Sequence, residues 1–217
     1  MKIDAILIDL DGTITDTERI YQKHWNKAAK ELGYDFFTKE DALNLRSAWG
    51  PYAEKMLYDK YADKLDFEKL HDLCAVNTRK ELEEKGTPLK PHAKEFLEKV
   101  RKCNKKIVLV SSSKMETIKW RIAEVGLENA FDDVVSAHDM KRGKPYPEPY
   151  LYACDVINVK PENTIAIEDS PNGVYSAIAA GCNTIMVPDM TEADEELKSK
   201  LYGYAENLME VLDILDV

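Results

Sequence analysis

Long apolar runs are missing from this chain of 217 residues. No stretch comes close to the ~18 consecutive apolar residues that a membrane-spanning helix needs. The first residues, Met1-Lys2-Ile3-Asp4, lack the pattern of a signal peptide. Paired cysteines are missing too, because no CxxC motif connects the four cysteines Cys74, Cys103, Cys154 and Cys182. We therefore expect a cytoplasmic protein with reduced thiols, and neither a disulfide framework nor a zinc site.

An excess of positive charge is also absent. The chain carries 30 Lys and Arg against 40 Asp and Glu, which gives a net charge of −10. This balance disfavours nucleic acid and anionic membranes as partners, so an anionic substrate would need a local binding site. The length and the hydrophobic content of 44% are typical of a soluble globular protein with one sizeable domain, or a domain with a smaller inserted one. We expect a monomer.

The stretch Ile6-Leu7-Ile8-Asp9-Leu10-Asp11-Gly12-Thr13 places two carboxylates at the end of an apolar strand. Gly12 then lets the backbone turn sharply. An unpaired buried charge costs roughly several kcal/mol, so Asp9 and Asp11 need a compensating partner such as a bound cation. The alternative at this point is an ordinary turn, since Asp-Gly is also a turn signal.

Only helical patterns follow this strand as far as residue 88. Tyr21, Trp25, Ala28 and Leu32 recur at helical spacing before Gly33, with Thr17 or Asp16 as the predicted N-cap. Further helices are predicted at about 39–46, 52–61 and 67–85, with a turn near Gly50-Pro51. A Pro-rich segment, residues 86–91, then marks a boundary.

From residue 89 onwards, strands alternate with helices. Strands are predicted at 106–110, 133–135, 164–167 and 183–187, and helices at 92–103, 114–126, 147–157, 171–180, 192–201 and 206–215. This alternation predicts an α/β fold with a doubly wound parallel sheet, to which the first strand also belongs. We expect a core domain of residues 1–14 and 89–217, and an inserted all-helical cap domain of residues 15–88.

Polar groups follow three further strands or loops of this predicted sheet. Ser111-Ser112-Ser113 follows one strand, where hydroxyls and helix N–H groups can hold an anion, although Ser113 could simply cap the helix. Lys144 lies in a loop, where most lysines are merely solvated. Glu168-Asp169 closes an apolar strand, and Ser170-Pro171 then supplies an N-cap and a first helical residue.

These groups together suit chemistry on a phosphate. Carboxylate oxygens without a His or Cys cluster are typical ligands of Mg²⁺, which also binds substrate phosphate oxygens. A cation, a lysine and helix N–H groups attract a dianionic phosphate. A spare carboxylate can attack phosphorus, and another can transfer a proton.

In this order, the segments Asp9-Leu10-Asp11-Gly12-Thr13, Ser111, Lys144 and Glu168-Asp169 resemble the four motifs of the haloacid dehalogenase superfamily. The helical insertion after the first motif, together with Glu168-Asp169-Ser170-Pro171-Asn172-Gly173-Val174 and Ala179-Ala180-Gly181, resembles its β-phosphoglucomutase/phosphoglycolate phosphatase branch. The resemblance covers essentially the whole chain.

The resemblance implies that Asp9 is the nucleophile that forms a phosphoaspartate and that Asp11 is the general acid and base. It implies that Ser111, Ser112 and Lys144 bind the transferring phosphoryl group. It also implies that Mg²⁺ is held by Asp9, the Asp11 backbone carbonyl and Asp169, with Glu168 as a further candidate ligand. The second acid of the first motif separates this chain from the haloalkanoate dehalogenases, which lack it.

We therefore expect a Mg²⁺-dependent phosphatase, a hydrolase of small organic phosphomonoesters such as sugar phosphates. The alternative is a β-phosphoglucomutase-type mutase, but Tyr21 stands where the mutases have a histidine. Trp49-Gly50-Pro51 stands near their phosphate-binding arginine, and Arg46 is the residue nearest to replacing it. A less favoured alternative is a non-catalytic signalling module that is phosphorylated on aspartate. The aromatic residues of the helical segment, including Trp25, form either its core or part of a substrate pocket.

Overall fold

Six parallel strands form the centre of the fold, in a computed structural model that describes residues 2–215. The strands lie in the order β3-β2-β1-β4-β5-β6, and every neighbouring pair is parallel. Their bounds are β1 Ala5–Ile8, β2 Lys106–Ser111, β3 Asp133–Ser136, β4 Thr164–Glu168, β5 Asn183–Met186 and β6 Gly203–Tyr204. The predicted α/β fold with a doubly wound parallel sheet is therefore confirmed.

Helices cover both faces of this sheet. Ile6 and Ile8 of β1 point to the apolar layer beneath α5, α6 and α10, whereas Leu7 points to the layer beneath α7 and α8. This alternation follows from the two-residue period of a strand, and because both faces are covered, β1 is apolar throughout. The helices of this α/β unit are α5 Ala93–Lys102, α6 Met115–Glu124, α7 Glu148–Val156, α8 Pro171–Ala179, α9 Glu195–Lys198 and α10 Leu208–Leu215.

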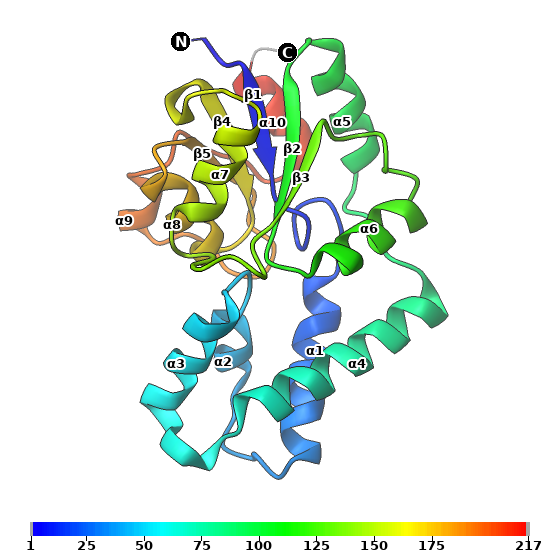
Figure 1. Cartoon of the computed structure of the whole chain (residues 1–217), viewed down its shortest axis with the longest axis vertical. Helices are drawn as coiled ribbons and strands as arrows, with labels where there is room; N and C mark the ends of the chain where they lie inside the picture. The colour runs from blue at the N-terminus through cyan, green and yellow to red at the C-terminus, as the bar shows by residue number, and fades with distance from the viewer. Residues whose placement is uncertain (1, 216–217) are drawn as a thin grey trace.

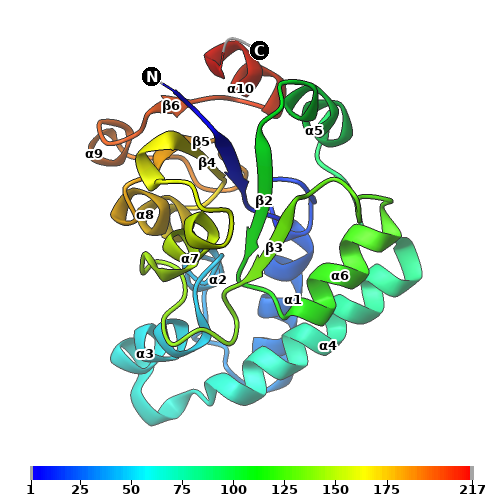
Figure 2. The same cartoon turned by 45° about the horizontal axis from the view of Figure 1, so that its top comes forward.

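A helical unit lies at the end of the molecule towards which the strands point (Figure 1). It consists of α1 Glu18–Glu31, α2 Lys39–Asn44, α3 Gly50–Tyr61 and α4 Phe67–Lys85, and it has an apolar cluster of its own. One side of α4 runs beside α6 of the α/β unit (Figure 2), where the Arg79 guanidinium lies 3.7 Å from the centre of the Trp120 ring. The division of the chain at 14/15 and 88/89 stays a prediction.

Within residues 2–215, no helix has both the length and the apolar character needed to cross a membrane. The four cysteines are free, and three of them, Cys74, Cys154 and Cys182, are buried.

Two local predictions were wrong. The helix expected over 192–201 covers only Glu195–Lys198, because the chain then turns to the sheet edge: the Tyr202 N–H donates to Thr184 O at 2.8 Å and begins the unpredicted strand β6. Gly50-Pro51 begins α3 instead of a turn, with proline in the first helical turn, where its missing N–H is tolerated. Thr17 is the N-cap residue of α1, as predicted, although its side chain makes no capping hydrogen bond.

The packing of α5 on the sheet leads to a prediction about stability. Phe96 of α5 is fully buried against the sheet. Replacing it by alanine should lower the free energy of unfolding by about 3–5 kcal/mol, since the cavity cannot close completely. Val76→Ala, at an exposed position of α4, should change it by less than about 0.5 kcal/mol. Denaturant unfolding measures both, and equal effects would contradict this assignment of the core.

Candidate active site

The carboxyl ends of β1, β2 and β4 meet at the sheet edge that faces the helical unit (Figure 1). Ile8 pairs with Ile167 in parallel register, and the Asp9 N–H donates to Ile167 O at 3.0 Å. Ser111 is the last residue of β2, and Glu168 is the last residue of β4. The parallel register therefore brings side chains together that are more than a hundred residues apart in the chain.

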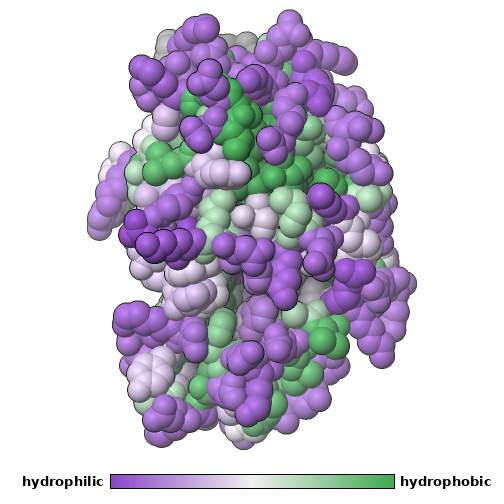
Figure 3. All heavy atoms as spheres, viewed as in Figure 1, coloured by the Kyte–Doolittle hydropathy of each residue, from purple (hydrophilic) through white to green (hydrophobic). Residues whose placement is uncertain are grey.

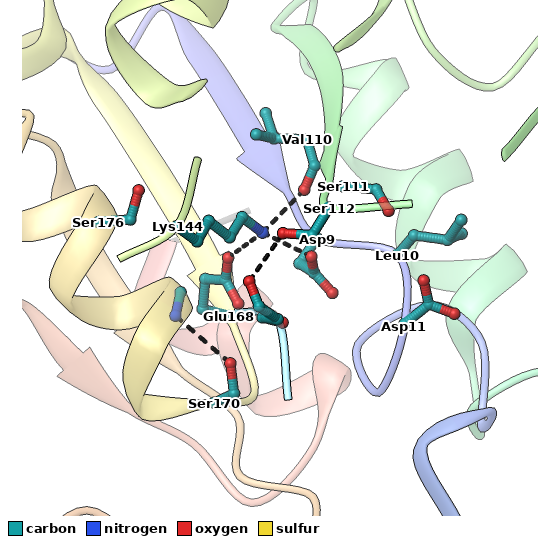
Figure 4. A network of polar contacts seen from close by, with 12 residues as sticks. Asp9, Leu10, Asp11, Val110, Ser111, Ser112, Lys144, Glu168, Ser170 and Ser176 are labelled. Carbon is teal, nitrogen blue, oxygen red and sulfur yellow. Dashed lines mark hydrogen bonds and ion pairs between the residues drawn. The ribbon is translucent and has the colours of Figure 1, made fainter. Parts of the chain in front are cut away.

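Lys144 is the centre of a buried ionic network (Figure 4). Its Nζ donates to Asp9 Oδ1 at 2.6 Å, to Glu168 Oε1 at 2.5 Å and to Val110 O at 2.9 Å. The Tyr150 hydroxyl also donates to Glu168 Oε1 at 2.5 Å. Burial lowers the pKa of Lys144, but the charges of Asp9 and Glu168 more than compensate and raise it above its usual value. The alternative of a solvated loop lysine was therefore wrong.

Asp9, Glu168 and Asp169 form a buried cluster of carboxylates. Each offers an oxygen within 4.8 Å of the others. Among the described residues, Asp9 Oδ2, Glu168 Oε2 and Asp169 Oδ1 have no hydrogen-bond partner. Buried oxygens of this kind are costly unless a cation or a donor meets them. The set is therefore chemically suited to a hard divalent cation such as Mg²⁺.

The ionisation of these carboxyls reflects their burial. Desolvation raises the pKa of Asp9 to about 8, although the nearby Lys144 ammonium acts in the opposite direction. Desolvation likewise raises the pKa of Asp169 well above its usual value, against the attraction of Arg46, whose Nη1 lies 3.4 Å from Asp169 Oδ2. Additional positive charge at this cluster would favour the ionised forms.

Asp11 points away from this cluster and is held by other groups. Its Oδ1 accepts from the Thr17 hydroxyl at 2.6 Å and from Arg121 Nη1. Its Oδ2 accepts from the Ser113 hydroxyl at 3.1 Å. The two aspartates of the first motif thus have separate surroundings, which suits two different tasks in one reaction.

The three consecutive serines contact three different groups. The buried Ser111 Oγ accepts from the Ser113 N–H at 3.1 Å, and Ser112 Oγ donates to Ser47 O of the helical unit at 2.7 Å. The Ser113 hydroxyl binds Asp11, and Lys114 is the N-cap residue of α6. The alternative that Ser113 caps the helix was therefore wrong. By contrast, the predicted cap at Ser170 is confirmed, since its side chain accepts from the N–H of Gly173.

A loop of the helical unit, residues 44–49, is docked onto the α/β unit. Asn172 Nδ2 donates to Asn44 O at 3.0 Å and to Arg46 O at 2.9 Å. The Trp49 N–H donates to Lys144 O at 2.8 Å. These bonds fix the loop beside the lysine network and leave Arg46 only 4% exposed at the carboxylate cluster.

A cavity of about 820 Å³ lies between the two units and is lined by part of the site. The surface is hollowed between them (Figure 3). Asp9, Asp11 and the three serines line the cavity from the α/β unit, and Tyr21, Trp25 and Arg46 line it from the helical unit. Trp25 also packs on the core of the helical unit, so it belongs both to that core and to the lining of the cavity. Trp49 and Tyr52 lie instead against Tyr146.

Sequence reasoning missed three residues of this site. In the sequence, Glu18 has the place of an acid that stabilises the start of a helix. In the structure it is buried, and desolvation raises its pKa to about 8, although the attraction of Arg46 acts in the opposite direction. Arg121 follows Ile118 at helical spacing on the buried face of α6, and a cation at such a position was the available signal. Tyr150 carried no signal beyond an aromatic residue in a helix.

The chain is similar to known proteins over nearly its whole length. A model of the haloacid dehalogenase-like hydrolase family matches residues 6–187. Hexitol phosphatase A of Escherichia coli is 29% identical over 205 residues, which are 92% of each chain. The phosphorylated carbohydrates phosphatase of Thermotoga maritima is 30% identical over 185 residues, 84% of each chain.

A solved structure of β-phosphoglucomutase from Clostridium difficile shares the fold, with a TM-score of 0.79 and 22% identity over 99% of this chain and 97% of that one. This neighbour shows the fold, and the phosphatase relatives confirm the predicted branch. The chain therefore belongs to the haloacid dehalogenase-like hydrolase family and is an enzyme of that family, as its four motifs predict.

Proposed function

We propose that this enzyme is a Mg²⁺-dependent phosphatase that hydrolyses a small organic phosphomonoester, such as a sugar phosphate, through a phosphoaspartate on Asp9. The named activities of the two relatives, a hexitol phosphatase and a phosphatase of phosphorylated carbohydrates, support this class of reaction. We also propose a cytoplasmic monomer, with the helical unit acting as a cap over the site.

The geometry of Asp9 is the observation that carries this proposal. Lys144 fixes one carboxylate oxygen at 2.6 Å, while the other lacks a hydrogen-bond partner within residues 2–215, and the side chain lines the cavity. A carboxylate that is held on one side and open on the other is prepared for attack on phosphorus.

The reaction then has two balanced steps. In the first, a carboxylate oxygen of Asp9 attacks phosphorus, the bond from phosphorus to the ester oxygen breaks, and that oxygen takes a proton from Asp11 and leaves as an alcohol. In the second, a water oxygen attacks phosphorus, gives a proton to Asp11, and the bond from phosphorus to the Asp9 oxygen breaks. Inorganic phosphate leaves and both aspartates are restored.

Mg²⁺ would be held by Asp9, Asp169 and the Asp11 backbone carbonyl, with Glu168 as a further candidate, and when bound it neutralises charge on the phosphoryl oxygens. Ser111, Ser112 and Lys144 would bind the phosphoryl group.

A sugar-phosphate mutase remains the alternative, and Arg46 is the observation that favours it. Its Nε and Nη2 are buried and without a hydrogen-bond partner among the described residues, so they could hold a second phosphate. However, Arg46 Nη1 already lies 3.4 Å from Asp169 Oδ2, which places the guanidinium at the reacting end of the site. Membership of a hydrolase family argues against the signalling module.

The test is phosphate release from a substrate panel, with and without Mg²⁺. The panel contains sugar phosphates, hexitol phosphates, phosphoglycolate, nucleotides and p-nitrophenyl phosphate, and glucose 1-phosphate conversion is followed in parallel with glucose 1,6-bisphosphate present. We expect Mg²⁺-dependent release from one or a few sugar-like substrates. Isomerisation without net release would make the enzyme a mutase, and no release from any substrate would overturn the proposal.

The nucleophile is tested by Asp9→Asn. The amide has nearly the same shape but cannot attack phosphorus, so kcat should fall by at least about 10³-fold. Asp155→Asn on the exposed side of α7 makes the same chemical change outside the site and should keep full activity. Circular dichroism and melting temperature establish that both variants fold. Near-normal turnover by a folded Asp9→Asn enzyme would exclude Asp9 as the nucleophile.

Protons should compete with Mg²⁺ for the carboxylate cluster. Because burial raises the pKa of Asp9 to about 8, metal binding must release protons in this range. We expect the half-saturating Mg²⁺ concentration, measured by thermal shift, to fall by up to about tenfold per pH unit between about pH 6 and pH 8. When a chelator removes Mg²⁺, the free energy of unfolding should change with pH in the opposite direction. A carboxyl whose pKa is raised in the folded protein stabilises the fold at low pH, and this contribution is lost as the pH rises through about 8.

Asp169→Asn is the matched variant for this experiment. It removes one proposed ligand and one titrating group, so it should bind Mg²⁺ more weakly at high pH and show a shallower pH dependence. Asp155→Asn should behave like the unmodified protein. An unchanged Mg²⁺ requirement in Asp169→Asn would place the metal elsewhere.

A further inference from the structure

Arg121 is a buried cation that the proposed reaction does not use. It lies on α6 with 1% of its surface exposed, beside the apolar Ile118 and Ile122 of the same helix. A buried guanidinium is costly unless it is paired, so its partners indicate what holds it there.

The two ends of its guanidinium bind different units of the molecule. Nη1 donates to Asp11 Oδ1 in the α/β unit, and Nη2 donates to the Tyr21 hydroxyl on α1 of the helical unit. The guanidinium carbon also lies 5.3 Å from the centre of the Tyr21 ring. A planar guanidinium can bind two acceptors at fixed angles, whereas a lysine ammonium is a single point charge on a flexible stem.

Asp11 is thereby held by donors from three segments. Besides Arg121, the Thr17 hydroxyl donates to Oδ1 at 2.6 Å from the start of α1, and the Ser113 hydroxyl donates to Oδ2 at 3.1 Å from the loop after β2. Of these three donors, Arg121 alone is charged, and it also contacts Tyr21.

We propose that Arg121 is a positioning residue: it orients the Asp11 carboxyl and, through Tyr21, makes that orientation depend on the docked helical unit. This inference rests on the proposed function of Asp11 as the acid and base of a phosphatase. The inference places Asp11, the proton-transferring group, in a hydrogen-bond network with Arg121 and Tyr21 that forms only when the helical unit is docked on the α/β unit.

The chemical consequence depends on the leaving group. When Asp9 attacks an alkyl phosphate, the departing alkoxide needs a proton from Asp11. A p-nitrophenolate leaves without one, because it is already stable as an anion near neutral pH. Misplacing Asp11 should therefore slow phosphoryl transfer from alkyl phosphates much more than transfer from p-nitrophenyl phosphate.

The experiment measures single-turnover transfer to Asp9 by rapid quench, for the best alkyl phosphate of the panel and for p-nitrophenyl phosphate. Arg121→Met should slow alkyl transfer by about 10²-fold or more, which is the usual scale of general acid catalysis. Nitrophenyl transfer should fall less than about tenfold, and Arg121→Lys should recover only part of the alkyl rate. Equal losses with both substrates, or no loss, in folded variants would overturn the inference.

Two further variants separate positioning from folding. Tyr21→Phe removes only the hydroxyl that Arg121 binds, and it should give a smaller loss with the same preference for alkyl substrates. Lys119→Met, on the exposed side of α6, is the matched control and should keep both rates.

A crystal structure of Arg121→Met gives a readout that does not depend on activity. We expect the Asp11 carboxyl to leave its contacts with Thr17 and Ser113. If it stays in place, Arg121 does not position it, whatever the enzyme hydrolyses. Conversely, an unmodified enzyme that releases no phosphate would refute the proposed function, while a displaced Asp11 would still support the positioning contact.

Discussion

The ammonium of Lys144 between Asp9 and Glu168 is the interaction on which the rest of the site depends. All three groups are almost completely buried, and at 2.5–2.6 Å the contacts are short enough for strong charge-assisted bonds. Removing one member of such a buried set leaves an uncompensated charge, at a cost of about 3–5 kcal/mol. Asp9 follows β1, Glu168 is the last residue of β4, and Lys144 precedes α7. The ionic network therefore requires these three segments to meet at one place.

The helical unit is also bound at Lys144. Its loop, residues 44–49, binds the backbone carbonyl of Lys144 through the Trp49 N–H at 2.8 Å. A side chain at Gly143 would meet Trp49, because a Cβ there would lie 2.8 Å from its ring. The segment that delivers the lysine to Asp9 therefore also receives the helical unit. Residues 143–144 therefore have two functions, since a shift of these residues would disturb both the ionic network and the docking of Arg46.

The sequence predicted those parts of the site that follow from local chemistry. Acids at the end of an apolar strand need compensation, which identified Asp9 and Asp169, and the order of the motifs pointed to Lys144. Contacts between segments that are far apart in the chain could not be predicted, because they have little pattern in the local sequence. Arg121 looks like one of many helix cations until its burial against Asp11 is known. The two-residue strand β6 is too short to have a period, and a hydrogen bond to β5 decides where α9 ends.

The balance of buried charge explains why the site is suited to both a divalent cation and a phosphate. Asp11 and Arg121 form a pair of their own. The other buried carboxyls of the site are Asp9, Glu18, Glu168 and Asp169, and within residues 2–215 Lys144 and Arg46 are the buried cations beside them. If all of these groups ionise, four negative and two positive charges leave an excess of two negative charges.

Burial raises the pKa values of Asp9, Glu18 and Asp169, and the neighbouring carboxylates raise them further, so protons reduce this excess in the free protein. One divalent cation would balance it completely and keep Asp9 ionised as a nucleophile. A phosphate dianion entering afterwards would again make the site negative, so its binding needs donors that are not yet used. Arg46 Nε and Nη2, which have no hydrogen-bond partner among the described residues, and the Ser111 hydroxyl, whose oxygen only accepts from the Ser113 N–H, are such donors. The helical unit thus supplies charge to the site as well as covering it.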